Sequence, residues 1–226
     1  EETLRALRDD TVAFAHQRSL VITLAAIPTV IAGLLPPAIA SLRASGEEAR
    51  LRLLDLAANE VAEAVASGEA DLGIGALPAL EPNTDFEPLF DDEMVLAVQP
   101  GHPLSAHAVL SWTDLAPYPL ILPAKGTGNR TLIDEASARA RGRLTWTFET
   151  VRTTTALSLV AGGAGVAILP RSALTGPGAG AAADSPVLCC PLTDPAIARP
   201  IGLLTRNGQA RSPVVSALCD ALRAAV

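Results

Sequence analysis

Lysine, aromatic side chains and long apolar runs are all scarce in this chain of 226 residues. Lys125 is the single lysine, and the formal net charge at pH 7 is -7 without any run of basic residues. A net-acidic chain of this kind is a poor match for the phosphates of a nucleic acid, so we expect no DNA binding by this chain alone. No apolar stretch reaches the roughly 20 residues that span a membrane, and the first residues lack signal-peptide character. These absences predict a soluble, cytoplasmic protein.

Residues that commonly carry catalysis or bind metals are also few. The cysteines and histidines are Cys189, Cys190, Cys219, His16, His102 and His107. The cysteines are an odd number without metal-ligand spacing, and we interpret them as buried thiols in a reducing compartment, with a redox role left open. No GxSxG, P-loop or HExxH motif occurs, and paired carboxylates such as Asp91 and Asp92 are interpreted as solvated charge. The sequence thus predicts no enzyme activity, no catalytic residue, no metal and no cofactor.

Apolar residues make up 49% of the chain and charged residues 18%, a composition typical of a globular protein. Their periodicity indicates strands that alternate with helices. The first predicted elements are strands at Leu20–Ala25, Arg50–Ala57, Asp71–Gly75, Phe86–Phe90 and Glu93–Gln99, with helices at Pro28–Ala44 and Glu60–Ser67. This alternation predicts βαβ units and a mostly parallel sheet.

The pattern restarts after His102, which indicates a second lobe. Strands are expected at Tyr118–Leu122, Trp146–Thr150, Val166–Leu169, Val187–Pro191 and Pro200–Thr205, and helices at Arg130–Arg141, Thr153–Ala161 and Ser212–Ala225. The fold class is therefore α/β, with two Rossmann-like lobes and two chain crossovers, near Val98–Gly101 and Thr193–Arg199. We assign residues 1–18 to a linker helix, 19–99 and 200–226 to lobe I, and 100–199 to lobe II.

A narrow apolar stripe runs along the expected linker helix. Leu4, Leu7, Thr11 and Phe14 recur at helical spacing, while most other positions are polar. The stripe needs cover from its own domain or from a second copy of the chain. We favour the second copy and expect the chain to self-associate.

Several longer segments occur in a fixed order along the chain: PTVIAGLLPPAIASLR, ASGEADLGIG, EMVLAVQPGHPL, WTDLAPYPLILPAKGTGNRTLID and LSLVAGGAGVAILP. No single segment is diagnostic, but their order across nearly the whole chain resembles the effector-binding domain of bacterial LysR-type transcriptional regulators. The resemblance implies a fold like the type 2 periplasmic binding proteins, with a small-molecule effector in the cleft between the lobes. It also implies a homodimer or homotetramer, and DNA binding through an N-terminal winged helix-turn-helix that this sequence does not include.

Ligands of open α/β sheets bind beyond the carboxyl ends of the strands, near helix N-termini. In lobe I these turns hold Ala26, Ile27 and Thr29, and Asn59 stands at the next one. Thr29 and Asn59 could each be a helix cap; the resemblance implies an effector contact at Thr29, and one at Asn59 because Ala58 cannot supply it. Ala76 falls where some members of the family carry an arginine for a ligand carboxylate, which argues against a dicarboxylate.

In lobe II the loop KGTGN precedes a helix and combines polar side chains with two glycines. Glycines let backbone N–H groups approach an anion, and Lys125 or Arg130 could neutralise it. Thr127 and Asn129 supply a hydroxyl and an amide, and one threonine of the run that begins at Thr153 can face the site. A plain surface turn is the alternative.

Two other classes of protein fit the same architecture. A solute-binding protein of a transporter shares the two lobes, and an enzyme such as a dehydratase or deaminase could be built on them. The enzyme would need a convergent set of acids, bases or cofactor ligands, which the sequence does not contain. The expected ligand is a small organic acid or a modestly polar metabolite.

Overall fold

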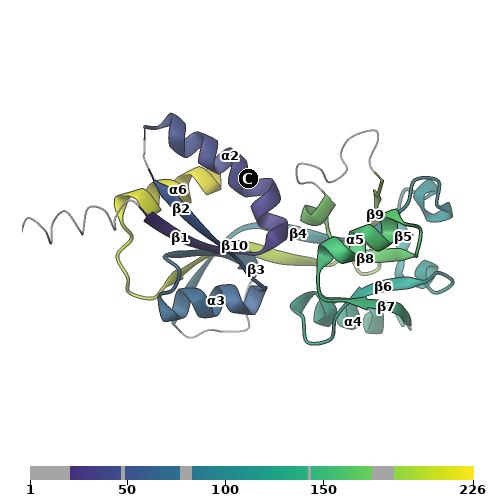
Figure 1. The fold of residues 1–226 in the computed structure, drawn as a ribbon. Helices are drawn as coiled ribbons and strands as arrows, with labels where there is room; N and C mark the ends of the chain where they lie inside the picture. Colours follow the sequence, from purple (N-terminus) through teal and green to yellow (C-terminus); the bar gives the residue numbers. More distant parts are fainter. Residues whose placement is uncertain (1–20, 47–48, 77–82, 142–143, 175–185) are drawn as a thin grey trace, which may run out of the picture. The chain divides into compact units, whose positions relative to one another are not determined.

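The computed structural model describes residues 21–46, 49–76, 83–141, 144–174 and 186–226 (Figure 1). The chain divides into two compact units: unit 1 contains the described parts of Glu1–Phe90 and Ile201–Val226, and unit 2 those of Asp91–Pro200. Strands β4 (Thr84–Val98) and β10 (Ala198–Arg206) belong to both units. The expected linker helix at 1–18, with its apolar stripe, lies outside the described residues, as does nearly all of the loop that follows Leu174.

Unit 1 is a twisted sheet with helices on both faces. Its elements are β1 (Val21–Ala26), α2 (Pro28–Ala44), β2 (Arg50–Asp55), α3 (Ala58–Ser67), β3 (Leu72–Ala76) and α6 (Pro213–Ala224), together with the adjoining parts of β4 and β10. Strand β1 pairs in parallel with β2 and β3, and β10 is antiparallel to β3. Helices α2 and α6 pack against each other on one face, and α3 covers the other face (Figure 1).

Helix α2 shows how the apolar spacing of the sequence produces this packing. Pro28 occupies the first turn, where its missing N–H costs nothing. The helix buries side chains that recur three or four residues apart, namely Val30, Leu34, Leu35, Ala38 and Leu42. They join one apolar core with β1, β3 and α6.

Gly33 lies on the exposed side of α2, and a Cβ added there would meet no atom within 4 Å. Glycine in a helix interior is less favourable than alanine because more backbone entropy is lost on folding. We therefore expect Gly33→Ala to raise the free energy of unfolding of unit 1 by about 0.5 to 1 kcal/mol. Urea unfolding of the two proteins measures this difference, and a destabilised variant would contradict the expectation.

Unit 2 is a mixed sheet with a separate apolar core on each face. Its elements are β5 (Leu110–Ser111), β6 (Leu120–Pro123), α4 (Gly128–Arg139), β7 (Trp146–Thr150), α5 (Thr153–Ala161), β8 (Val166–Pro170), β9 (Leu188–Thr193) and the 3-10 helices Pro103–Ala106, Trp112–Leu115 and Arg171–Leu174. Strand β6 pairs in parallel with β7 and β8, whereas β4 is antiparallel to β8 and β9. Helix α4 contributes Ile133 to one core, and α5 contributes Val160 to the other.

Several element boundaries differ from the sequence-based expectation. The two strands expected at Phe86–Phe90 and Glu93–Gln99 are one continuous strand, β4. The division between units falls after Phe90, whereas the expected boundary followed residue 99.

The interpretation of Asp92 as solvated charge is wrong. Asp92 is only 3% exposed, and its carboxylate accepts hydrogen bonds from Ser172 and Arg199 within the fold.

Candidate functional site

The carboxyl end of the sheet in unit 1 gathers the candidates proposed for lobe I. Because β1, β2 and β3 are parallel, their carboxyl ends meet at one edge, where Ala26 pairs with Asp55 and with Ile74. Ala26 and Ile27 are buried there, and Ala76 ends β3 beside Ile201. This edge carries the N-termini of α2 and α3.

Thr29 is the second residue of α2 and does not cap it. The N-cap is Ile27, which makes no side-chain cap hydrogen bond. The backbone N–H of Ile27 donates to the Ile74 carbonyl at 3.2 Å, and its carbonyl accepts from Val30 at 3.1 Å. The N-cap position therefore belongs to Ile27, and Thr29 lies two residues beyond it, inside the helix.

Asn59 likewise lies inside its helix, because α3 begins at Ala58, two residues before the expected start. The Glu60 carboxylate accepts from the Ala57 backbone N–H at 2.7 Å and provides the local cap. A glutamate at this position satisfies the backbone N–H of the N-cap residue, Ala57. Asn59 is the second residue of α3, so the N-cap position belongs to Ala57 and not to Asn59.

In unit 2 the candidates also meet at the carboxyl edge of parallel strands. Pro123 at the end of β6 pairs with Thr150 at the end of β7, and the Ala124 N–H donates to the Thr150 carbonyl at 2.9 Å. The turn after β6 and the start of α5 at Thr153 are therefore neighbours. Thr153 is half-buried, and the N-cap of its helix, Arg152, makes no side-chain cap hydrogen bond.

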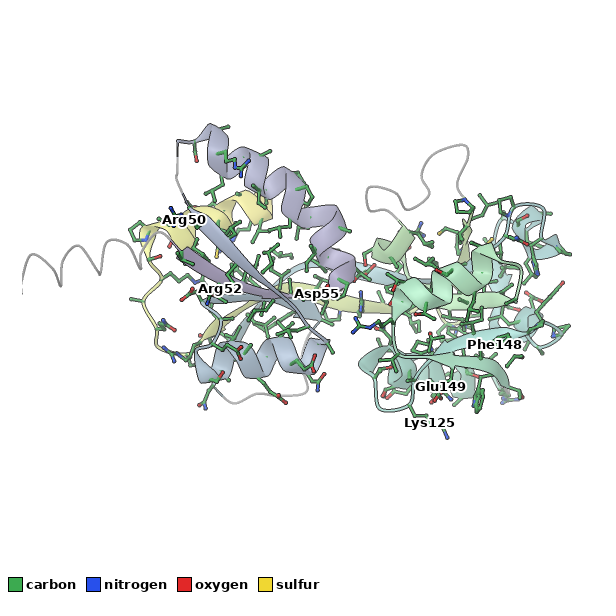
Figure 2. The ribbon with its side chains drawn as sticks, viewed as in Figure 1. Arg50, Arg52, Asp55, Lys125, Phe148 and Glu149 are labelled. Carbon is green, nitrogen blue, oxygen red and sulfur yellow. The ribbon has the colours of Figure 1, made fainter. Side chains whose placement is uncertain are left out.

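Thr127 is the N-cap of α4. Its Oγ1 accepts from the Arg130 backbone N–H at 3.3 Å and donates to the Ala124 carbonyl at 2.8 Å. Gly126 has φ +85°, a left-handed conformation that glycine adopts without a steric penalty. Lys125 is exposed beside this turn, and Figure 2 shows its side chain extending away from the ribbon.

Arg130 was a candidate for neutralising an anion, but its guanidinium is buried and bonded within unit 2. It donates to Asp134 at 2.9 Å, to Glu149 at 3.1 Å and to the Pro123 carbonyl at 3.1 Å. The residue is 7% exposed. Its charge is balanced by two carboxylates, which leaves Lys125 as the exposed cation of this turn.

Sequence reasoning missed a buried polar cluster that contacts the same turn. Arg199 donates to Asp92 Oδ2 through Nε at 3.1 Å and through Nη2 at 2.9 Å, and to Asn129 Oδ1 through Nη1 at 3.1 Å. Ser172 donates to the same Asp92 carboxylate from its backbone N at 2.9 Å and from Oγ at 2.7 Å. Burial lowers the pKa of Arg199, and the Asp92 carboxylate opposes that shift. One feature of the sequence could have indicated this buried cluster: Arg199 stands inside the otherwise apolar run AIARPIGLL.

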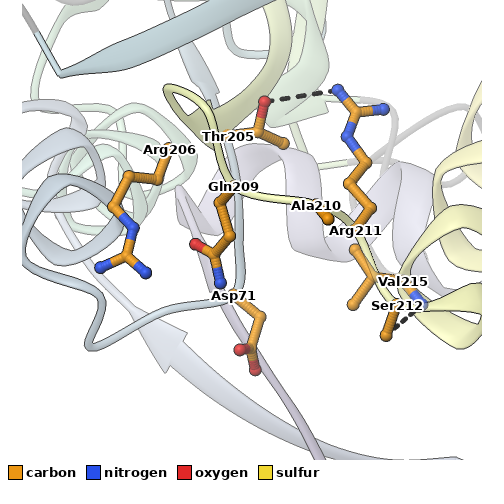
Figure 3. A pocket seen from close by; sticks show the side chains of 8 residues that line it. All are labelled: Asp71, Thr205, Arg206, Gln209, Ala210, Arg211, Ser212 and Val215. Atoms are coloured by element: carbon orange, nitrogen blue, oxygen red, sulfur yellow. Dashed lines mark hydrogen bonds between the residues drawn. The ribbon is translucent and has the colours of Figure 1, made fainter.

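A small cavity of about 110 Å³ occurs elsewhere in unit 1 (Figure 3). It lies at the amino end of β3 and between β10 and α6, so it is at the opposite edge of the sheet from the candidates. Its lining residues are Asp71, Thr205, Arg206, Gln209, Ala210, Arg211, Ser212 and Val215. Arg211 donates to Thr205 at 3.3 Å, and Asp71 accepts from the Thr23 N–H at 2.8 Å, so both side chains have structural partners.

The described residues do not favour metal binding or a reactive thiol. No group of three or more His, Cys, Asp or Glu residues there could hold a metal ion. Burial raises the pKa of the Cys189, Cys190 and Cys219 thiols, which disfavours the reactive thiolate. None of the described helices is both long enough and apolar enough to cross a membrane.

Known proteins are similar to this chain in sequence and in architecture. The family model described as LysR substrate binding domain matches residues 15–226. The uncharacterized HTH-type transcriptional regulator YbhD of Escherichia coli is 33% identical over 213 residues, which are 94% of this chain and 64% of that protein. The effector binding domain of QuiR in complex with shikimate has a TM-score of 0.77 at 23% identity, covering 90% of this chain and 95% of that one. The BenM effector binding domain with its effector benzoate has a TM-score of 0.75 at 24% identity, covering 90% of each chain.

Two α/β units joined by two crossing strands are the architecture that this chain shares with these solved effector-binding domains. This chain belongs to the LysR substrate-binding domain family, whose relatives are transcriptional regulators. It spans less than two thirds of the length of the YbhD regulator.

Proposed function

We propose that this chain senses a small organic acid and that the bound acid controls DNA binding by a longer transcriptional regulator. The observation that carries the proposal is the start of α4, where an exposed lysine and a helix N-terminus present cationic and N–H groups together. The structural neighbours in complex with shikimate and benzoate support a small acidic ligand. The domain acts by binding alone, without enzymatic activity, and the regulator works in the cytoplasm with its DNA.

A thermal-shift screen of small metabolites tests this function. A ligand at 100 times its dissociation constant should stabilise the folded domain by about 2.7 kcal/mol. We expect carboxylic acids among the hits, with their neutral amides inactive at the same concentration. A screen in which only neutral or cationic compounds raise the melting temperature would contradict the proposal.

We further propose that residues at the carboxyl edges of both units contact the effector. Thr29→Val keeps the shape of the side chain but removes the hydroxyl, so a buried ligand oxygen loses a partner at a cost of about 1 to 3 kcal/mol. Affinity for the best acid of the screen should fall roughly tenfold to a hundredfold.

Thr127→Val should show a different combination of effects, because Thr127 also caps α4. Besides weaker binding, loss of the cap should cost the free protein about 1 kcal/mol. Calorimetric titration and thermal melts of both variants measure the two effects separately. Thr113→Val, at an exposed site in unit 2, is the control. Unchanged affinity in both Thr29→Val and Thr127→Val would place the ligand elsewhere.

Self-association as a homodimer or homotetramer belongs to the same proposal. The edge strands of the described sheets leave large apolar side chains exposed: Leu53 on β2, and Trp146 and Phe148 on β7. Exposed apolar side chains on edge strands favour pairing with another chain. Sedimentation of the whole chain should show a dimer or larger species that persists at moderate salt, and a strictly monomeric profile at high concentration would count against it.

A further inference from the structure

The cavity at the amino end of β3 carries charged side chains of both signs (Figure 3). Arg206 is the last residue of β10, and Asp71 immediately precedes β3. These two strands are antiparallel, with Leu204 opposite Gly73. The same register continued by two residues places Arg206 opposite Asp71, so the two side chains leave the sheet on the same side.

Arg206 and Asp71 nevertheless form no ion pair, either with each other or with another described residue. The Asp71 carboxylate accepts from the Thr23 backbone N–H at 2.8 Å. The Arg206 guanidinium lies against Gly68, where an added Cβ would be 2.5 Å from Nη1. Separate contacts thus hold the two charges apart, and both side chains line the cavity of about 110 Å³.

The other polar groups of the cavity can still bond an occupant. Arg211 lies 3.8 Å from the Glu87 carboxylate and donates to the Thr205 hydroxyl at 3.3 Å. Thr205 is 7% exposed, and its own hydroxyl proton has no acceptor among the described residues. The Gln209 side chain likewise makes no hydrogen bond within the described parts of the chain. A hydroxyl donor and an amide are therefore available beside the two charges.

The two charges disfavour a ligand of a single charge sign. An anion drawn to Arg206 is repelled by Asp71, and a cation drawn to Asp71 is repelled by Arg206. We propose that this cavity binds a small zwitterionic α-amino acid, with its carboxylate toward Arg206 and its ammonium group toward Asp71. The volume admits a small side chain, for which Ala210 and Val215 supply apolar contact.

This amino-acid site is separate from the proposed effector site. All of its lining residues belong to unit 1, and it lies at the opposite edge of the sheet from the N-termini of α2 and α3. Binding there does not require that the effector contacts be the ones proposed above. A regulator with both sites responds to two different ligands.

L-alanine is the probe, and propionate and ethylamine each keep one of its two charged groups. In the ¹⁵N-labelled chain, L-alanine should shift the backbone amide of Gly208 and the side-chain NH₂ of Gln209 in a saturable manner. Propionate and ethylamine should bind at least about tenfold more weakly, because each leaves one charge of the cavity unmet. The side-chain NH₂ of Gln99, bonded to the Ala161 carbonyl in unit 2, is the internal reference. Absence of a saturable response to L-alanine, or equal affinity for propionate, would overturn the proposal.

Two charge-removing variants assign the two ends of the ligand. Arg206→Gln should lower L-alanine affinity at least about tenfold and abolish the preference for L-alanine over ethylamine. Asp71→Asn keeps an oxygen for the Thr23 N–H, and it should lower the affinity by a similar factor and abolish the preference over propionate. Unchanged L-alanine affinity in either variant would show that the removed charge does not contact the ligand.

Arg52→Gln is the matched control, because Arg52 is an exposed arginine of unit 1 on β2 that does not line the cavity. Its L-alanine affinity should equal that of the parent chain, and the melting temperatures of both glutamine variants should stay close to the parent value. An Arg206→Gln protein that melts early and loses all three ligands equally would indicate a structural role and contradict the proposal. Thr29→Val and Thr127→Val should leave L-alanine affinity unchanged; a loss there would assign L-alanine to the effector site and refute a second site.

Discussion

Replacing Arg199 with methionine is expected to lower the free energy of unfolding of unit 2 by about 3 to 5 kcal/mol. Methionine fills much of the same volume but carries no charge, so the Asp92 carboxylate remains buried with Ser172 as its remaining partner in the cluster. An unpaired buried carboxylate must then be desolvated or protonated, and both are costly. Urea unfolding monitored by hydrogen exchange of unit 2 amides measures the loss.

Arg171→Met is the matched control for this experiment. Arg171 also pairs with an acidic residue of β4, Glu93, at 2.7 Å, but the two side chains are 41% and 61% exposed. Solvent-exposed ion pairs contribute about 0 to 1 kcal/mol, so the control should change stability little. Equal losses in Arg199→Met and Arg171→Met would show that burial of the Asp92 pair carries no special energy. Adding Asp92→Leu to Arg199→Met should recover part of the loss, since no charge is then left buried.

Replacing Trp112 with alanine is expected to destabilise unit 2 by about 3 to 5 kcal/mol. Trp112 is fully buried, and its Nε1 donates to the Pro195 carbonyl at 2.8 Å. The substitution removes a large apolar side chain from the core that also contains Leu104, Leu110 and Leu192. It also leaves the Pro195 carbonyl without this donor, which adds to the cavity term.

The second tryptophan of the chain provides both the control and the reporter. Trp146 on the edge strand β7 is 48% exposed, so Trp146→Ala should cost much less. Each variant keeps one tryptophan, and the fluorescence of that residue follows urea unfolding of unit 2. A loss in Trp146→Ala as large as that in Trp112→Ala would mean that the core around Trp112 does not dominate the stability of this unit.

Local sequence signals predicted the regular elements well. The expected bounds of Pro28–Ala44, Trp146–Thr150 and Thr153–Ala161 are those of α2, β7 and α5. Proline at a helix start and a glycine after a helix end act within a few residues, so a linear sequence displays them. The same signals located the strand-to-helix turns that hold the candidate residues.

Contacts between distant residues could not be found in this way. Asp92 and Arg199 are 107 positions apart, and nothing near either residue indicates its partner. The sequence suggested that Asp92 is solvated and that Arg130 is available to an anion. In both cases a partner on another element, Arg199 for Asp92 and Glu149 for Arg130, changes the interpretation. Whether a charged side chain is free depends on tertiary pairing, which local periodicity does not encode.

The interruption of unit 1 by unit 2 affects the order in which a ribosome can produce a finished fold. Unit 2 is the single segment Asp91–Pro200, whereas unit 1 needs Ile201–Val226 to complete its sheet and cover it with α6. All the residues of unit 2 therefore leave the exit tunnel before unit 1 acquires β10. Until then the nascent first unit exposes the edge of β3 and the face of α2 that α6 later covers. Such transient apolar surfaces bind chaperones and aggregate most readily, so the slowest and most vulnerable step in the biogenesis of this protein should be the return of its chain to the first unit.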